Sequence, residues 1–252
     1  MTAAALQPNR TASRVIPVVR LHFVNRMTTV WTPLLVLAAI LLVNIAVWAL
    51  ILANTGPDDR ADVAQGLQYS GASFWIFVYM MVVAIQAMNL TFPFAQGFST
   101  TRRDYYLGTI LAFLIYSVGY GAILTLLSLI EDWTGGWGLG GRMFTAVYFG
   151  GGEWFQRLFV FAGGLLFFFM VGVAFGTVYV RAKARGLIAF SLALAVVVLG
   201  AAFLISVTGS WPAVGAWFVS AQAPGVVAVL LIPAALAGIA GFFILRGATP
   251  KS

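Results

Sequence analysis

The chain has 252 residues, of which 62% are hydrophobic and only 8% are charged. Average soluble domains carry about 25% charged residues, so this sequence has too little charge to cover a soluble surface, and its class is an integral membrane protein. The net charge of +7 does not indicate nucleic-acid binding, because the arginines are scattered between apolar runs instead of gathering in one cluster. The absence of cysteine excludes disulfides and cysteine-based metal sites.

Residues 1–28 are expected to form a polar tail followed by an interfacial helix. Pro17 suits the first turn of a helix. Val19, Phe23 and Met27 follow at helical spacing and make one apolar stripe, which predicts a helix lying on the membrane surface. The alternative is a basic juxtamembrane tail whose arginines only fix the topology.

Six later segments are long and apolar enough to cross a bilayer, which takes about 20 mostly apolar residues. Strands of a membrane barrel would give short alternating patterns instead of continuous runs, so the predicted fold is an all-α membrane protein with six transmembrane helices. The transmembrane domain is predicted over residues 29–246, with a short tail at 247–252. The six predicted spans are roughly Thr29–Ala53, Ser73–Gln96, Tyr105–Ile130, Leu158–Val180, Leu187–Val207 and Val226–Leu245.

Lysine and arginine flank these spans unequally. One side has only Arg60, Arg142 and Arg157. Because positive residues collect on the cytoplasmic side, the chain is predicted to be a multi-pass protein of the inner (plasma) membrane with both termini in the cytoplasm. The predicted cytoplasmic side holds Arg10, Arg14, Arg20, Arg26, Arg102, Arg103, Arg181, Lys183, Arg185, Arg246 and Lys251.

The loop before the last span, from Gly209 to Pro224, has no charged residue and carries three large aromatic side chains. Such a loop need not stay in water. It is predicted to turn back into the membrane, which is tolerated where protein covers its backbone.

The second span carries a polar stripe. Tyr79, Gln86, Asn89 and Pro93 recur at steps of three, four or seven residues, which places them on one helix face. One interpretation is hydrogen bonding between helices, because uncharged amides in hydrocarbon need partners. The other is that these four residues line the pathway of an amphipathic or lipid-like substrate.

Signatures of catalysis are missing from the sequence. None of the six predicted spans contains an acid, a lysine or an arginine, and the glycine-rich stretch between the third and fourth spans lacks the lysine of a phosphate-binding loop. The chain is therefore not expected to be an enzyme or to hydrolyse ATP itself.

A polar turn, GFSTTRRDYYLG at residues 97–108, separates the second and third spans. With an amphipathic N-terminal segment and six spans around it, this turn resembles that of the permease subunit of type 2 ATP-binding-cassette (ABC) exporters. The resemblance covers the layout of nearly the whole chain. One departure is Thr109, where members often have lysine.

The resemblance implies a cytoplasmic coupling helix between spans two and three that docks in a groove of a separate ATPase subunit. The arginines would pair with acids of that partner, and an aromatic side chain would anchor apolarly. The alternative is a solvated loop whose arginines only enforce topology. The residues expected to dock are Ser99, Thr100, Thr101, Arg102, Arg103, Asp104, Tyr105 and Tyr106.

The resemblance also implies the cofactors and partners. No cofactor is expected in this chain, and ATP and magnesium would belong to the ATPase subunit. The expected partners are that ATPase, a second permease copy or paralogue, and membrane lipid, with no nucleic acid. The transported substrate is expected to be hydrophobic or amphipathic, such as a drug, lipid or peptide.

Two other functions stay open at this point. An ATPase-independent channel or carrier would need ion-coordinating groups or inverted repeats at mid-membrane, and neither is evident in the sequence. A structural membrane subunit without transport activity is the other alternative.

Overall fold

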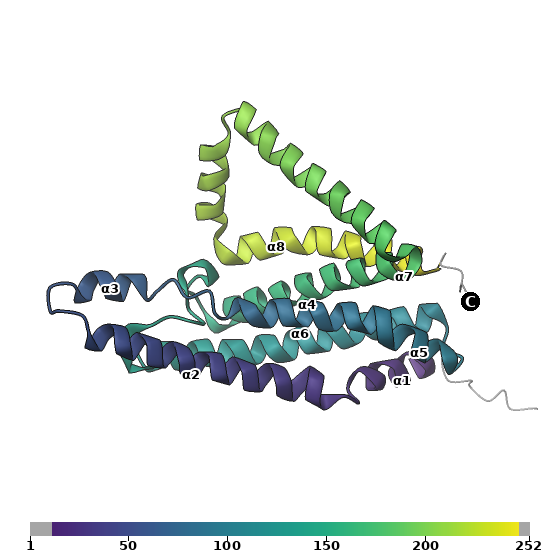
Figure 1. Ribbon diagram of the computed structural model, residues 1–252, viewed down its shortest axis with the longest axis horizontal. Coiled ribbons are helices and arrows are strands. Elements are labelled where there is room, and N and C mark those ends of the chain that lie inside the picture. The colour runs from purple at the N-terminus through teal and green to yellow at the C-terminus, as the bar shows by residue number, and fades with distance from the viewer. Residues whose placement is uncertain (1–11, 247–252) are drawn as a thin grey trace, which may run out of the picture.

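The computed structural model describes residues 12–246, and all regular structure in that range is helical (Figure 1). This confirms the all-helical prediction. Helices suit such an apolar chain because each satisfies its own backbone hydrogen bonds without water. Five helical stretches in the described range are long and apolar enough to cross a membrane, namely Met27–Ala53, Phe74–Gly97, Arg102–Trp133, Trp154–Val207 and Trp211–Arg246.

A bundle of nearly parallel helices forms the body of the protein (Figure 1). Its members are α2 (Thr32–Ala53), α4 (Phe74–Gln86), α6 (Arg102–Trp133) and the first part of α7 (Trp154–Val207). The loops between α2 and α4 and between α6 and α7 lie at one end of the bundle, called here the loop end. The turn between α5 (Phe92–Gly97) and α6 lies at the opposite end, called the turn end.

Small residues allow close packing of α7 on its neighbours. A Cβ atom added at Gly121 of α6 would lie 2.8 Å from the Cβ of Ala162. A Cβ atom added at Gly172 of α7 would lie 2.4 Å from the Met81 carbonyl oxygen, and one added at Gly176 would lie 2.6 Å from the Met88 Cβ. The helices approach each other only because these positions have no side chain, as expected for small residues spaced four apart in membrane helices.

Two π-helical turns interrupt the first two spans. They are η1 (Met27–Trp31), which precedes α2, and η2 (Ala87–Thr91), which joins α4 to α5. Each π turn is followed directly by a first helical turn that contains a proline, Pro33 or Pro93. Proline has no N–H group and its ring displaces the preceding carbonyls, which explains a local widening of the helix at these two places.

Two of the longest helices are broken by a single residue. Lys183 in α7 has φ 54° and ψ −156°, and Gln222 in α8 (Trp211–Arg246) has φ 51° and ψ −174°. The chain reverses direction at Lys183 and turns sharply again at Gln222. The three helical pieces after Lys183 form an open triangle beside the bundle (Figure 1). The helical piece from residue 211 to the break runs back toward the bundle (Figure 1). That this stretch re-enters the membrane stays a prediction.

The span count differs from the prediction. The expected fourth and fifth spans both lie in α7, so five helical stretches qualify where the sequence predicts six. The reason is the break at Lys183, which reverses the chain without a loop. An unbroken helix of 54 residues would be about 80 Å long, far more than the hydrocarbon thickness of about 30 Å.

The N-terminal helix is α1 (Ala12–His22), and it packs along α6. The prediction that Pro17 begins this helix is wrong, because Pro17 lies inside it. Residues 1–11, and the predicted tail at 247–252, lie outside the described residues.

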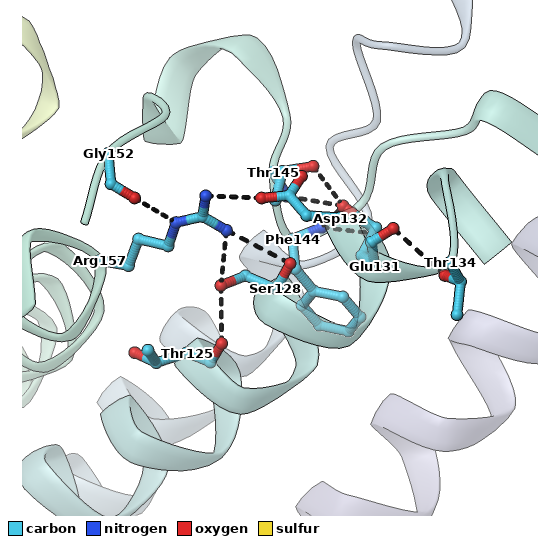
Figure 2. Close-up of polar contacts among 9 residues, drawn as sticks. All are labelled: Thr125, Ser128, Glu131, Asp132, Thr134, Phe144, Thr145, Gly152 and Arg157. Atoms are coloured by element: carbon cyan, nitrogen blue, oxygen red, sulfur yellow. Dashed lines mark hydrogen bonds and ion pairs between the residues drawn. The ribbon is translucent and has the colours of Figure 1, made fainter. Parts of the chain in front are cut away.

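At the loop end, the carboxylate of Glu131 organises the chain that follows α6. Glu131 is 1% exposed, and its two oxygens accept from five donor groups of the next loop. Figure 2 shows those of Phe144 and Thr145. Such a carboxylate is fully satisfied although it is buried. The donors are the Trp137 indole N–H at 2.8 Å, the backbone N–H groups of Met143, Phe144 and Thr145 at 2.7 to 3.2 Å, and the Thr145 hydroxyl at 2.6 Å.

An ion pair beside this carboxylate ties α7 to the end of α6. The guanidinium of Arg157 lies 2.5 Å from the Asp132 carboxylate and also donates to the carbonyl and hydroxyl of Ser128 (Figure 2). The loop between these helices includes η3 (Gly136–Gly140) and η4 (Val147–Phe149). The loop end is therefore held by one buried acid and one bridging arginine.

We predict that Glu131→Gln lowers the free energy of unfolding by roughly 2 kcal/mol or more, because an amide cannot accept all five hydrogen bonds and buried donors are left unpaired. Glu153→Gln is the matched control, since Glu153 is an exposed acid in the same loop region and its side chain does not cap α7. Thermal unfolding followed by tryptophan emission measures both variants. Equal melting temperatures for the two would contradict the role given to Glu131.

Candidate functional site

The polar turn singled out in the sequence is short and well defined. Residues 98–101 join α5 to α6, and Ser99 adopts φ 59° in the left-handed region. The Thr101 side chain caps α6 by accepting from the Asp104 backbone N–H at 3.1 Å. Between α5 and α6 the described chain has no separate helix, so the predicted coupling helix is not an element of its own. The motif forms the turn and the first turns of α6.

The eight residues expected to dock on a partner divide into two groups. Ser99, Thr101 and Arg103 are exposed, and the neighbouring Phe98 is 72% exposed. The others turn inward: Thr100 and Arg102 are half-buried, while Asp104, Tyr105 and Tyr106 are buried. In this conformation the two tyrosines contact the chain itself and not its surroundings.

Both buried tyrosines tie the start of α6 to other helices. The Tyr105 hydroxyl donates to the Ala87 carbonyl oxygen of η2 at 2.6 Å. The Tyr106 hydroxyl donates to the Gly238 carbonyl oxygen of α8 at 2.5 Å. Gly241 leaves room for this contact, since a Cβ atom added there would lie 2.7 Å from the same hydroxyl. The beginning of α6 is thus bonded to η2 and to α8.

The arginines at this end differ in what they contact. The Arg102 guanidinium donates to the Arg246 carbonyl oxygen at 3.4 Å, and Arg181 donates to the Ile244 carbonyl oxygen at 3.2 Å. The last carbonyls of a helix lack intrahelical partners and carry partial negative charge, so these two cations stabilise the end of α8. Arg103 is exposed at the turn.

The N-terminal helix docks on the same part of α6. The His22 imidazole lies 2.9 Å from the Thr109 hydroxyl. Val18 packs directly on Gly108, since a Cβ atom added at Gly108 would lie only 2.6 Å from the Val18 Cβ. His22 is 8% exposed, and its burial lowers its pKa from 6.5 to about 4. It is therefore neutral at physiological pH.

One face of α6 continues these contacts toward mid-bundle. The Tyr116 hydroxyl donates to the His22 carbonyl oxygen at 2.9 Å, and the Tyr120 hydroxyl donates to the Thr29 carbonyl oxygen at 2.7 Å. Phe23 also stacks on Tyr116 with 4.5 Å between ring centroids. This face was not predicted from the sequence. Its signal is a row of tyrosine and threonine at steps of four and seven, namely Tyr105, Thr109, Tyr116 and Tyr120.

The four residues predicted to line a substrate pathway do not act as one group. The Tyr79 hydroxyl donates to the Thr28 carbonyl oxygen at 2.7 Å, which is a contact between helices. Gln86 and Pro93 are exposed. The Asn89 side-chain oxygen is buried and has no hydrogen-bond partner within the described chain. Tyr79 thus fits the packing interpretation, and the pathway role of the other three stays a prediction.

The described residues contain no candidate metal site, and the comparisons with known proteins found no match. Among residues 12–246, no three histidine, aspartate or glutamate side chains gather so that they could hold a metal ion. No protein-family model, curated protein or solved structure matches the chain. Its function is therefore argued from the turn and its contacts.

We predict that acid weakens the docking of α1 through His22. Burial holds the pKa of His22 near 4 in the folded protein, below its ordinary value of 6.5. Between pH 4 and pH 6.5, the state with α1 undocked therefore binds more protons than the docked state. The stabilisation is complete above pH 6.5 and is lost as pH falls toward 4, by at most roughly 3 kcal/mol. His22→Gln stays neutral and keeps a polar group for Thr109. Melting temperatures of parent and variant should converge above pH 6.5 and diverge below it, and parallel profiles would contradict the prediction.

We also predict opposite effects for two stripe residues of the second span. Tyr79→Phe leaves the Thr28 carbonyl without its hydroxyl donor and should cost about 1 kcal/mol. Asn89→Leu removes an unpaired buried oxygen and should leave stability unchanged or raise it. Thermal unfolding measures both. A large loss of stability for Asn89→Leu would show that its amide has a partner in the membrane-embedded protein.

Proposed function

We propose that this chain is the membrane-spanning permease subunit of an ATP-driven ABC transporter that exports a hydrophobic or amphipathic substrate. A separate ATPase subunit binds ATP and magnesium and docks on the turn before α6. The observation that carries the proposal is the number of elements fastened to the first two turns of α6.

Those two turns are bonded to three neighbours at once. Tyr105 holds η2, Tyr106 and Arg102 hold the C-terminal half of α8, and Thr109 holds α1. A loop that only fixes topology needs positive charge but no such fastening. A force applied at the turn would instead move α1, α8 and the second span together.

The surface offered to the ATPase consists of the exposed residues of the turn. Phe98 provides an apolar anchor, and Arg103 provides a cation that can pair with an acid of the partner. Tyr105 and Tyr106 do not touch the partner in this account. They carry its motion into the bundle.

Six spans and cytoplasmic termini remain part of the proposal. The break at Lys183 divides α7 into two pieces, each long enough to cross the bilayer, and Arg181 and Arg185 flank the break. The start of α1 and the end of α8 lie at the same end of the bundle as the turn (Figure 1). This supports a cytoplasmic turn end, because the positive residues gather there.

A second permease copy or paralogue would complete the assembly. From residue 191 to 201, the second piece of α7 is exposed on every side. An apolar helix that stands apart from its own bundle has to be covered by lipid or by protein. In the proposed transporter, this piece faces the partner permease across the export pathway.

The proposal is tested with Arg103→Glu. We predict that the tagged chain co-purifies with an ATP-binding-cassette ATPase, and that this variant lowers the recovered ATPase at least tenfold. Arg102 is left intact because it stabilises the end of α8. Arg185→Glu is the matched control, an exposed cation at the same end of the protein but outside the turn. If the parent chain recovers no such ATPase, or both variants lose it equally, the proposal fails.

A further inference from the structure

A cavity of about 680 Å³ lies at the loop end, where the last helical pieces meet the bundle. Its wall is built from the start of α4, the loop around η4, the first part of α7, and α8 on both sides of the Gln222 break. The volume falls within the range of about 300–1,000 Å³ that is typical of small-molecule sites. The residues that matter below are Phe74, Phe77, Tyr148, Phe168, Gln222 and Leu230.

The lining contains no charged residue. Six phenylalanines and one tyrosine contribute rings, and the rest is aliphatic or glycine apart from Gln222. The polar stripe of the second span takes no part, because that span contributes only Phe74 and Phe77. A charged ligand would lose its hydration here without finding a counter-charge, so the lining selects against ions.

Polarity in this cavity changes along its depth. The Tyr148 hydroxyl, the Gln222 amide and the peptide groups of Gly150 and Gly151 come from the η4 loop and the break in α8. Phe77, Phe168 and Leu230 lie further along their helices, toward mid-bundle. The polar groups of the lining therefore lie at the loop end of the cavity, and the part toward mid-bundle is apolar.

Backbone features keep this space open. Gly164 lies beside Phe77, and a Cβ there would come within 3.0 Å of the Phe77 ring. Gln222 has a positive φ of 51°, which is strained for a residue with a side chain. That strained residue breaks α8 at the loop end of the cavity, and Phe218 and Ala223 on either side of it line the wall.

We propose that this cavity binds an uncharged amphipathic molecule, with its hydrocarbon part among Phe77, Phe168 and Leu230 and its polar head at Tyr148 and Gln222. That this molecule is the substrate of the exporter rests on the proposed function. That the cavity binds it does not depend on the ATPase.

The test uses the purified full-length chain in lipid nanodiscs and a monoacylglycerol with a photoreactive diazirine at the end of its acyl chain. Label is located by peptide mass spectrometry. We expect it on the segments around Phe168 and Leu230. We expect at least fivefold less label there from the fatty-acid anion with the same tail, and from a phosphatidylcholine with the same tail.

Cavity-filling variants show whether the label reports this site. Val226→Trp places an indole in the cavity and should reduce labelling by monoacylglycerol at least fivefold. Val229→Trp is the matched control, because Val229 lies on the same helix, is 47% exposed and is not part of the lining. Leu230→Trp replaces the first variant if that one does not fold, as judged by its melting temperature.

Three outcomes overturn the inference. They are label spread evenly over the exposed helix from residue 191 to 201, equal labelling of the two tryptophan variants, and equal labelling by phosphatidylcholine. The last would identify an ordinary bilayer lipid site. Because no ATPase is present, failure here leaves the turn-docking proposal standing, and failure of ATPase recovery leaves this site standing.

Discussion

The interaction on which this structure depends most is the hydrogen bond that a buried tyrosine of α6 donates to a backbone carbonyl of another segment. A buried hydroxyl without a partner costs free energy, so each of these bonds favours one position of the segment that accepts it. Tyr105 and Tyr120 reach the two π turns, where the regular helical ladder is disturbed, and Tyr116 reaches the carbonyl of the last residue of α1. In hydrocarbon such a bond has no competition from water, so each one fixes the position of a whole segment.

The same helix is held firmly at both of its ends. At the turn end, Tyr106 and the Arg102 guanidinium fasten α6 to α8. At the loop end, Glu131 gathers the loop that follows, and Arg157 ties α7 to Asp132 and Ser128 (Figure 2). A helix of 32 residues fixed in this way can carry a displacement along the bundle. In the proposed transporter, it would link the exposed turn to the loop after α6, which lines the cavity.

Much of the fold follows from the sequence, and particular residues explain where it does not. Long apolar runs identify the helices, because a helix satisfies its own backbone hydrogen bonds where no water is present. The break at Lys183 could not be read in this way, because the charged residues around it indicate a loop and the chain instead reverses at a single residue. Pro17 does not mark the start of α1, because it is accommodated inside a helix that packs on α6.

The candidate site was predictable in place but not in detail. The motif marks the turn, yet Tyr105 and Tyr106 point inward, because their hydroxyls complete hydrogen bonds with Ala87 and Gly238 that lie far away in sequence. The role of Glu131 could not be predicted, since most of its donors are backbone N–H groups that carry no sequence signature.

The most direct test of the central claim is a crosslink from the turn itself in living cells. Phe98, which is 72% exposed, is replaced by the photoreactive amino acid benzoylphenylalanine, and adducts formed on irradiation are identified by mass spectrometry. The account predicts a covalent adduct with an ATPase that carries a phosphate-binding loop, and none from the same label at Trp217 on the far side of the protein. Adducts with lipid alone, or with the same partners from both positions, would contradict it.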